Sequence, residues 1–181
     1  MDAVIIGVSD KSILWRHGSL EKEQYENLVQ DYAGLLSNYF DNLILTPDEG
    51  VYSDIAKAFG KIKGEKPIAF IPDKDEKFGT KHLQYYEGFE IRGIDGDWYK
   101  LNAELVTKGN VVICIGFSPG SLIELGYIKY QQKFQGKDIK LFVDKRFIEK
   151  PLPKSFEEQI KNLFYFNDLS ELESLLKSKL F

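Results

Sequence analysis

The sequence predicts an α/β fold, a doubly wound, mostly parallel sheet in a Rossmann-like, three-layer α/β/α arrangement. Two observations support this prediction. Short apolar runs alternate with longer segments of helical periodicity along the whole chain. Most of these runs are apolar on both faces, as expected for strands of a parallel sheet that is covered by helices on both sides. Because the 181 residues contain no linker, repeat or low-complexity tract, we expect 1–181 to form a single domain.

The first part of the chain supplies three strands and two helices. Residues 3–8 are apolar and lead into a polar loop, so they predict the first strand. Residues 21–40 place apolar side chains at steps of three and four, as an amphipathic helix does. Residues 42–46 and 67–71 are short apolar runs that predict strands. Between them, residues 51–62 carry Ile55, Ala58 and Phe59 on one helical face.

The second part continues the alternation. We expect strands at 89–94, 111–115, 139–143 and 163–166, and helices at 98–108, 121–134, 155–162 and 169–176. Asn167 or Asp168 is the expected cap of the last helix. Residues 73–88 are polar and aromatic without clear periodicity, and we interpret them as an excursion or lid over the sheet edge.

Composition excludes several classes of function. No apolar stretch is long enough to cross a membrane, and the N-terminus lacks the basic region of a secretory signal. We therefore expect a cytoplasmic protein without a membrane partner. The net charge of −4 and the lack of an evident basic stripe predict no nucleic-acid partner. One cysteine, Cys114, and two distant histidines, His17 and His82, cannot form a typical structural zinc site, and we expect neither metal nor cofactor.

Ligands of doubly wound sheets bind beyond the carboxyl ends of the strands. Three expected loops follow strands there and contain glycine or polar residues. The candidate ligand-binding residues are Gly7, Ser9 and Asp10 in the first loop, Asp48, Glu49 and Gly50 in the second, and Gly116, Ser118, Pro119, Gly120 and Ser121 in the third. The alternative is structural: Ser9 and Asp10 can cap a turn or helix, and Asp48 and Glu49 can simply precede a helix N-terminus.

The third loop also precedes a candidate catalytic acid. An apolar strand ends at Gly116, a helix is expected from Ser121, and Glu124 lies one turn into that helix. Free N–H groups at a helix start bind oxygen ligands, and Glu124 would face such a ligand. Alternatively, Ser121 and Glu124 match the S/T-x-x-E capping box, in which Glu124 would accept a backbone N–H instead.

This segment resembles motifs of two families. Gly120-Ser121-x-x-Glu124 resembles the second half of the PGGxGTxxE signature of LOG-type phosphoribohydrolases. These enzymes belong to the SLOG group of Rossmann-like proteins, which includes the DprA-like domains. The segment through Gly126 is also similar to the Gly-x-x-x-Glu-Leu-Gly-Tyr segment of nucleoside 2-deoxyribosyltransferases, in which that glutamate is the nucleophile. The resemblance implies a small-molecule nucleotide or nucleoside as partner, and LOG-type relatives also suggest a homodimer.

The leading hypothesis is a nucleotide-binding domain over 1–181 that cleaves or transfers at the N-glycosidic bond through Glu124. Three departures from the families favour an alternative. The Arg-Lys pair that LOG-type enzymes have on the preceding helix is absent, and two positions of the loop differ. Phe117-Ser118 replaces the Gly-Gly of LOG-type enzymes, and Ser118 also stands where the deoxyribosyltransferases have an aspartate. The alternative is a non-catalytic nucleotide sensor or carrier that acts through a partner or a homo-oligomer. Lys100 is a candidate phosphate contact or a solvated helix lysine, and the candidates for stacking on a base are Trp15, Trp98, Tyr85 and Tyr86.

Overall fold

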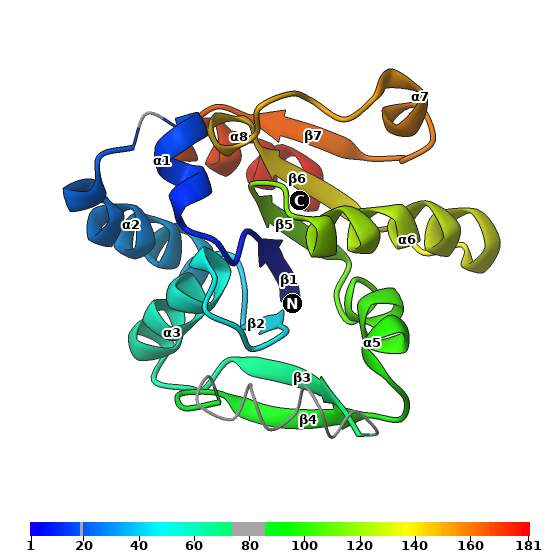
Figure 1. Cartoon of the computed structure of the whole chain (residues 1–181), viewed down its shortest axis with the longest axis horizontal. Helices are drawn as coiled ribbons and strands as arrows, with labels where there is room; N and C mark the ends of the chain where they lie inside the picture. Colours follow the sequence, from blue (N-terminus) through cyan, green and yellow to red (C-terminus); the bar gives the residue numbers. More distant parts are fainter. Residues whose placement is uncertain (19, 74–85) are drawn as a thin grey trace.

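The structure is a computed structural model that describes residues 1–18, 20–73 and 86–181. Within these ranges one sheet of seven strands has the order β4-β3-β2-β1-β5-β6-β7, and every neighbouring pair is parallel (Figure 1). The strands are β1 (Asp2–Gly7), β2 (Asn42–Leu45), β3 (Ile68–Pro72), β4 (Glu90–Ile94), β5 (Val111–Ile115), β6 (Lys140–Asp144) and β7 (Leu163–Phe166). The predicted doubly wound fold is therefore confirmed.

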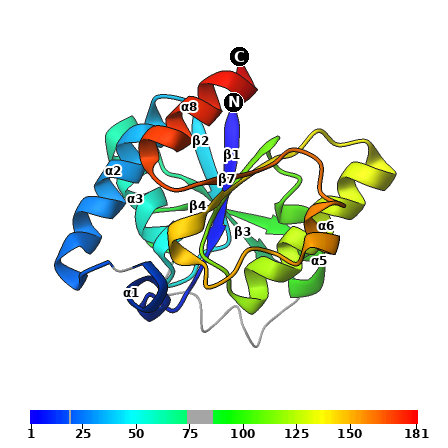
Figure 2. The same ribbon diagram turned by 90° about the horizontal axis from the view of Figure 1, so that it is seen from above.

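Helices cover both faces of the sheet (Figure 2). One layer contains α2 (Tyr25–Ser37), α3 (Val51–Lys63) and α8 (Leu169–Leu180), and the other contains α5 (Trp98–Leu105) and α6 (Pro119–Gln135). Two short helices, α1 (Ser12–Gly18) and α7 (Lys154–Glu157), and the 3-10 turns Lys22–Gln24 and Lys145–Phe147 complete the described elements. Each layer packs its apolar side chains on one face of the sheet, which gives two hydrophobic cores.

The strand order reverses between β1 and β5. From β1 the chain builds outward through β2, β3 and β4, whereas β5, β6 and β7 extend in the opposite direction. All five residues of β5 are buried, because this strand lies in the middle of the sheet. The reversal leaves the carboxyl ends of β1 and β5 side by side without a crossing connection above them, which is where such folds bind ligands.

Some local predictions need correction. Helix α1 was not predicted. The helix expected over 21–40 begins as α helix only at Tyr25, after a 3-10 turn. The helix expected from Ser121 begins two residues earlier, at Pro119, and the one expected over 155–162 is the single turn Lys154–Glu157. Most of the excursion expected over 73–88, together with His82 and Tyr85, lies outside the described residues.

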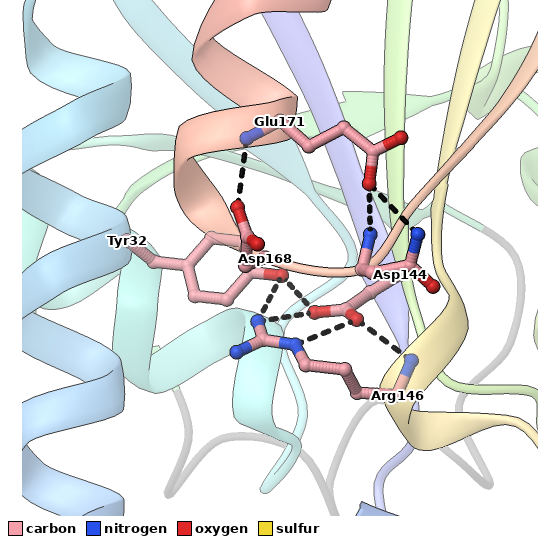
Figure 3. A network of polar contacts seen from close by, with 6 residues as sticks. Tyr32, Asp144, Arg146, Asp168 and Glu171 are labelled. Atoms are coloured by element: carbon pink, nitrogen blue, oxygen red, sulfur yellow. Dashed lines mark hydrogen bonds and ion pairs between the residues drawn. The ribbon is translucent and has the colours of Figure 1, made fainter.

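A buried polar cluster joins α2 to the end of β6 (Figure 3). The carboxylate of Asp144, at the end of β6, is fully buried and accepts hydrogen bonds from the Tyr32 hydroxyl and from the Arg146 side chain, with Nη2 to Oδ2 at 2.7 Å and Nε to Oδ1 at 3.0 Å. Nearby, Asp168 caps α8 by accepting from the Glu171 backbone N–H at 2.8 Å. The predicted cap is thus confirmed.

The close approach of β1 and β5 requires a glycine at position 7. A Cβ atom added to Gly7 would lie 2.4 Å from the backbone oxygen of Ile115, which cannot move without shifting β5. We expect Gly7→Ala to lower the free energy of unfolding by about 1–3 kcal/mol, the usual cost of overpacking. The control is Gly34→Ala in α2, where a Cβ meets nothing within 4 Å and better helix propensity should add about 0.5–1 kcal/mol. Urea denaturation of both variants measures the difference, and equal effects would contradict this explanation.

Candidate functional site

A pocket of about 440 Å³ opens at the carboxyl ends of β1 and β5, where the strand order reverses. This volume suits a small-molecule ligand. Its walls come from the end of β1, from the loops that follow β2 and β5, and from α3, α5 and α6 near their starts. The lining residues are Ile5, Ile6, Gly7, Ser9, Thr46, Asp48, Tyr52, Asp97, Trp98, Tyr99, Asn102, Leu105, Ser118, Gly120, Ser121, Ile123 and Glu124.

Two serines fix the start of α6 beside the pocket. Ser118 is the N-cap: its Oγ accepts from the Ser121 backbone N–H at 3.1 Å, while the Ser121 Oγ accepts from the Ser118 N–H at 2.8 Å. The Ser118 hydroxyl also donates to the backbone oxygen of Gly7 at 3.2 Å and so ties the loop to β1. The interpretation of Ser121 and Glu124 as the capping box is wrong, because Pro119 takes the first helical position and moves the cap to Ser118.

This capping arrangement leaves the Glu124 carboxylate without a role at the helix terminus. The residue is only 8% exposed and lines the pocket. Its carboxylate forms no hydrogen bond or ion pair with any residue that the structure describes. Burial raises the pKa of Glu124 to about 8, so this acid is mostly protonated at neutral pH. An unpaired buried acid in a pocket is unfavourable for folding, which is typical of a functional group.

Ser9, Asp48 and Tyr52 form a hydrogen-bonded cluster across the pocket. The Ser9 hydroxyl donates to the Asp48 Oδ2 at 2.6 Å, and the Tyr52 hydroxyl lies 3.4 Å from the same oxygen. The other carboxylate oxygen of Asp48 accepts from the Glu49 backbone N–H at 2.7 Å. Burial chiefly raises the pKa of Tyr52, and the charges of Asp48 and Glu124 contribute to the same shift. The cluster therefore lies within electrostatic range of Glu124.

The remaining wall is aromatic and polar. Trp98 and Tyr99, at the start of α5, line the pocket. Trp98 therefore lies where stacking on a bound base requires it. Trp15, another stacking candidate, instead packs against Tyr25, with 5.5 Å between the ring centroids. The hydroxyl oxygen of Thr46 is buried and has no hydrogen-bond partner among the described residues. A ligand atom can supply the missing partner.

Seven of the twelve predicted site residues meet in this pocket: Gly7, Ser9, Asp48, Ser118, Gly120, Ser121 and Glu124. Five do not line it: Asp10, Glu49, Gly50, Gly116 and Pro119. Each of these has another position or task in the fold. Lys100, the candidate phosphate contact, also lies outside the lining. Its ammonium group instead forms ion pairs with Asp95 at 3.7 Å and with Glu104 at 3.6 Å.

The five residues outside the pocket are explained locally. Asp10 accepts from the Ser12 backbone N–H at 3.0 Å and pairs with Arg16 at 3.3 Å, on the outside of the molecule. Gly50 is the N-cap of α3, where an added Cβ would meet the Tyr52 ring, and Gly116 has a φ of +76° in the turn after β5. Glu49 is exposed in the loop before α3, and Pro119 is exposed at the first position of α6.

Sequence reasoning missed Thr46, Tyr52, Asp97 and Asn102. Thr46 ends a predicted strand next to a predicted loop, so its position was a usable signal. Asp97 is a capping residue that accepts from the Lys100 N–H at 3.0 Å, and an aspartate before an expected helix start also signals it. For Tyr52 and Asn102 no local pattern distinguishes a pocket residue from a core or surface residue.

Two features are absent from the part of the chain that the structure describes. Among the described helices, none has the length and hydropathy that crossing a bilayer requires. Nor do three or more His, Cys, Asp or Glu side chains gather there as a metal site would need.

No protein-family model matches the chain, and no curated protein has significant sequence similarity to it. Solved structures do resemble it. The molybdenum cofactor binding protein from Rippkaea orientalis is 16% identical, with 99% of this chain and 97% of that chain covered at a TM-score of 0.66. The molybdenum cofactor carrier protein from Chlamydomonas reinhardtii is 14% identical, with the same coverage and a TM-score of 0.65.

A third solved structure corrects one prediction. DNA processing protein A from Helicobacter pylori, described for its single-stranded DNA binding mode, is 14% identical and covers 98% of this chain and 80% of its own at a TM-score of 0.58. A protein of the same fold thus binds nucleic acid, so the prediction of no nucleic-acid partner is wrong. At these identities the likenesses establish the Rossmann-like fold and leave the finer LOG-type resemblance a prediction.

Proposed function

We propose that the pocket at the β1–β5 junction binds a nucleoside or small nucleotide and that Glu124 acts at its N-glycosidic bond. The observation that carries this proposal is the buried Glu124 carboxyl group, which has no described partner and lines a pocket of ligand size. A single sheet that contains strands from residue 2 to residue 166 also supports one ligand-binding domain over 1–181.

The charge of the lining favours the uncharged nucleoside. Asp48 and Asp97 line the pocket beside the protonated Glu124, and none of the described lining residues is lysine or arginine. Carboxylates accept hydrogen bonds from ribose hydroxyls but repel a phosphate. In our proposal Asp48 binds the sugar hydroxyls, Thr46 accepts or donates a further hydrogen bond, and Trp98 stacks on the base.

Glu124 would then supply the proton that the leaving base needs. As the bond from the sugar C1′ to the base nitrogen breaks, the protonated carboxyl group donates its proton to the base. Water adds to C1′, and its released proton returns to Glu124, so the residue is regenerated. Since the pKa of Glu124 is about 8, activity should fall as the pH rises through that value.

The test combines binding and turnover. Nucleosides and nucleoside monophosphates are added to the protein, thermal shift reports binding, and chromatography reports free base. A ligand at 100 times its Kd should add about 2.7 kcal/mol of stability. We expect Glu124→Gln to bind but release no base, and the control Asp10→Asn, outside the pocket, to behave like the parent. If Glu124→Gln still releases the base, the catalytic proposal is wrong.

The second candidate is a carrier or sensor that binds without turnover. Its support is that two similar folds are described as molybdenum cofactor carrier and binding proteins. The same assay, extended to the molybdenum cofactor, separates the two candidates. A stability shift without release of base selects the carrier, and no shift with any of these ligands rejects both.

A further inference from the structure

The outer face of α6 exposes two aromatic rings that do not line the β1–β5 pocket. Tyr130 is 51% and Phe134 is 70% exposed, although the opposite face of α6 packs Leu125 and Ile128 into the core. The two rings lie nearly parallel, with their planes 9° apart and their centroids separated by 6.0 Å. Exposed parallel rings on a helix offer flat surfaces on which another planar group can stack.

Lysines flank both rings. The ammonium group of Lys129 lies 5.3 Å from the Tyr130 ring centroid, and that of Lys133 lies 5.3 Å from the Phe134 centroid. Both lysines also line a groove of about 290 Å³ together with Gln132, Gln159 and Lys161. No acidic side chain belongs to this lining among the described residues, and none of the three lysines forms an ion pair with a described residue. The groove is thus locally basic in a chain whose net charge is −4.

A buried glutamine fixes the position of the third lysine. The Gln132 side chain donates to the backbone oxygens of Ile139 at 2.9 Å and Lys161 at 2.7 Å, and it accepts from the Lys161 backbone N–H at 2.8 Å. These bonds fasten the segment before β7 to α6. As a result, the backbone of Lys161 is held beside Lys129 and Lys133 and is not left on an independent loop.

We propose that this lysine–aromatic face, formed by Lys129, Tyr130, Lys133, Phe134 and Lys161, binds single-stranded nucleic acid. The lysines would contact successive phosphates, and the two rings would stack on unpaired bases. Stacking needs an open base face, so the site selects single strands over duplexes. Because lysine–phosphate contacts and stacking read no base edges, binding is independent of sequence.

Charge complementarity favours this partner over a second copy of the chain. An isologous contact centred on this groove would bring the same three lysines of two copies together, without an acidic side chain in the groove lining to pair with them. A polyanion instead satisfies all three ammonium groups and also covers the rings. A membrane surface would also attract lysines and aromatic side chains, so vesicle binding is measured separately in the test below.

Fluorescence anisotropy with a labelled oligothymidylate at low ionic strength tests the proposal. Three phosphate contacts predict that log K falls with log salt concentration with a slope of about −2. Phe134→Ala should weaken binding roughly 5- to 150-fold, the loss of one stacked base, and Lys133→Glu should weaken it and flatten the slope. The matched controls Ile62→Ala and Lys61→Glu, an exposed apolar–lysine pair on α3, should change neither. Glu124→Gln should also bind normally, which separates this test from that of the pocket.

Three results would overturn the assignment. If the protein binds a duplex as tightly as the single strand and Phe134→Ala has no effect, the face binds nucleic acid by general electrostatic attraction alone. Sedimentation that shows a dimer in the parent and a monomer in Phe134→Ala would assign the face to a second copy. Binding to phosphatidylserine vesicles that depends on Lys133, without binding to the oligothymidylate, would assign it to a membrane.

Discussion

Replacing Glu124 by glutamine is expected to stabilise the protein at neutral and alkaline pH. Glutamine has the size of the protonated acid but cannot ionise, so it removes the cost of a buried charge. With the pKa of Glu124 at about 8 in the folded state and near 4.5 in the unfolded chain, we expect a gain of about 3 kcal/mol at pH 7 and 4–5 kcal/mol above pH 8. The stabilised variant would be inactive in the proposed reaction.

The sign of the pH dependence follows from proton binding. Between pH 4.5 and pH 8 the folded protein holds a proton on Glu124 that the unfolded chain has lost. The free energy of unfolding of the parent therefore falls as the pH rises through this window, and below it the parent and Glu124→Gln should be equally stable. Urea denaturation across this range measures both curves.

An exposed carboxylate supplies the control for this prediction. Glu158 is exposed on the α7 side of the molecule, and Glu158→Gln should change stability by less than about 0.5 kcal/mol at any pH in the window. If the parent and Glu124→Gln keep a constant difference from pH 4.5 to pH 8, Glu124 is not a buried acid of raised pKa. The general-acid role proposed for it would then lose its physical basis.

The sequence predicted the fold because the relevant signals are local. Val111–Ile115 is apolar on both faces, and this pattern alone predicts a strand that is buried between two helical layers. The order of the strands is a property of contacts between distant segments, so no single segment contained it. Helix α1 escaped prediction because its seven residues are too few for a clear apolar period, and its start depends on Asp10 accepting from Ser12.

The candidate site was predictable only in part, for two physical reasons. Ser9 and Asp10 are neighbours in sequence, but the chain turns into α1 there, so Ser9 reaches the pocket and Asp10 faces outward. Pro119 does indicate the start of α6, because proline favours the first position of a helix, and this rule predicts Ser118 as the N-cap. By contrast, the positions of Tyr52 and Asn102 depend on how α3 and α5 approach the switch point, which only the assembled sheet determines.

The buried cluster of Tyr32, Asp144 and Arg146 is expected to be among the most sensitive parts of the core. Asp144→Ala removes the carboxylate that pairs with the Arg146 guanidinium, a side chain that is only 30% exposed (Figure 3). It also leaves the Tyr32 hydroxyl without an acceptor. We expect a loss of about 3–5 kcal/mol in the free energy of unfolding, measured by urea denaturation. Tyr32→Phe should cost less, about 1–3 kcal/mol, because the two bonds between Arg146 and Asp144 remain.

Two further variants show whether the loss comes from the uncompensated charge. Glu90→Gln breaks the exposed ion pair between Arg92 Nε and Glu90 Oε1, which lie 2.7 Å apart. Because solvent screens this pair, the free energy of unfolding should fall by less than about 1 kcal/mol. The double variant Asp144→Leu with Arg146→Met removes both charges and restores apolar volume, so it should be more stable than Asp144→Ala. If the double variant is as unstable as the single one, the cluster stabilises the fold through its geometry and hydrogen bonds, since charge balance alone would have been restored.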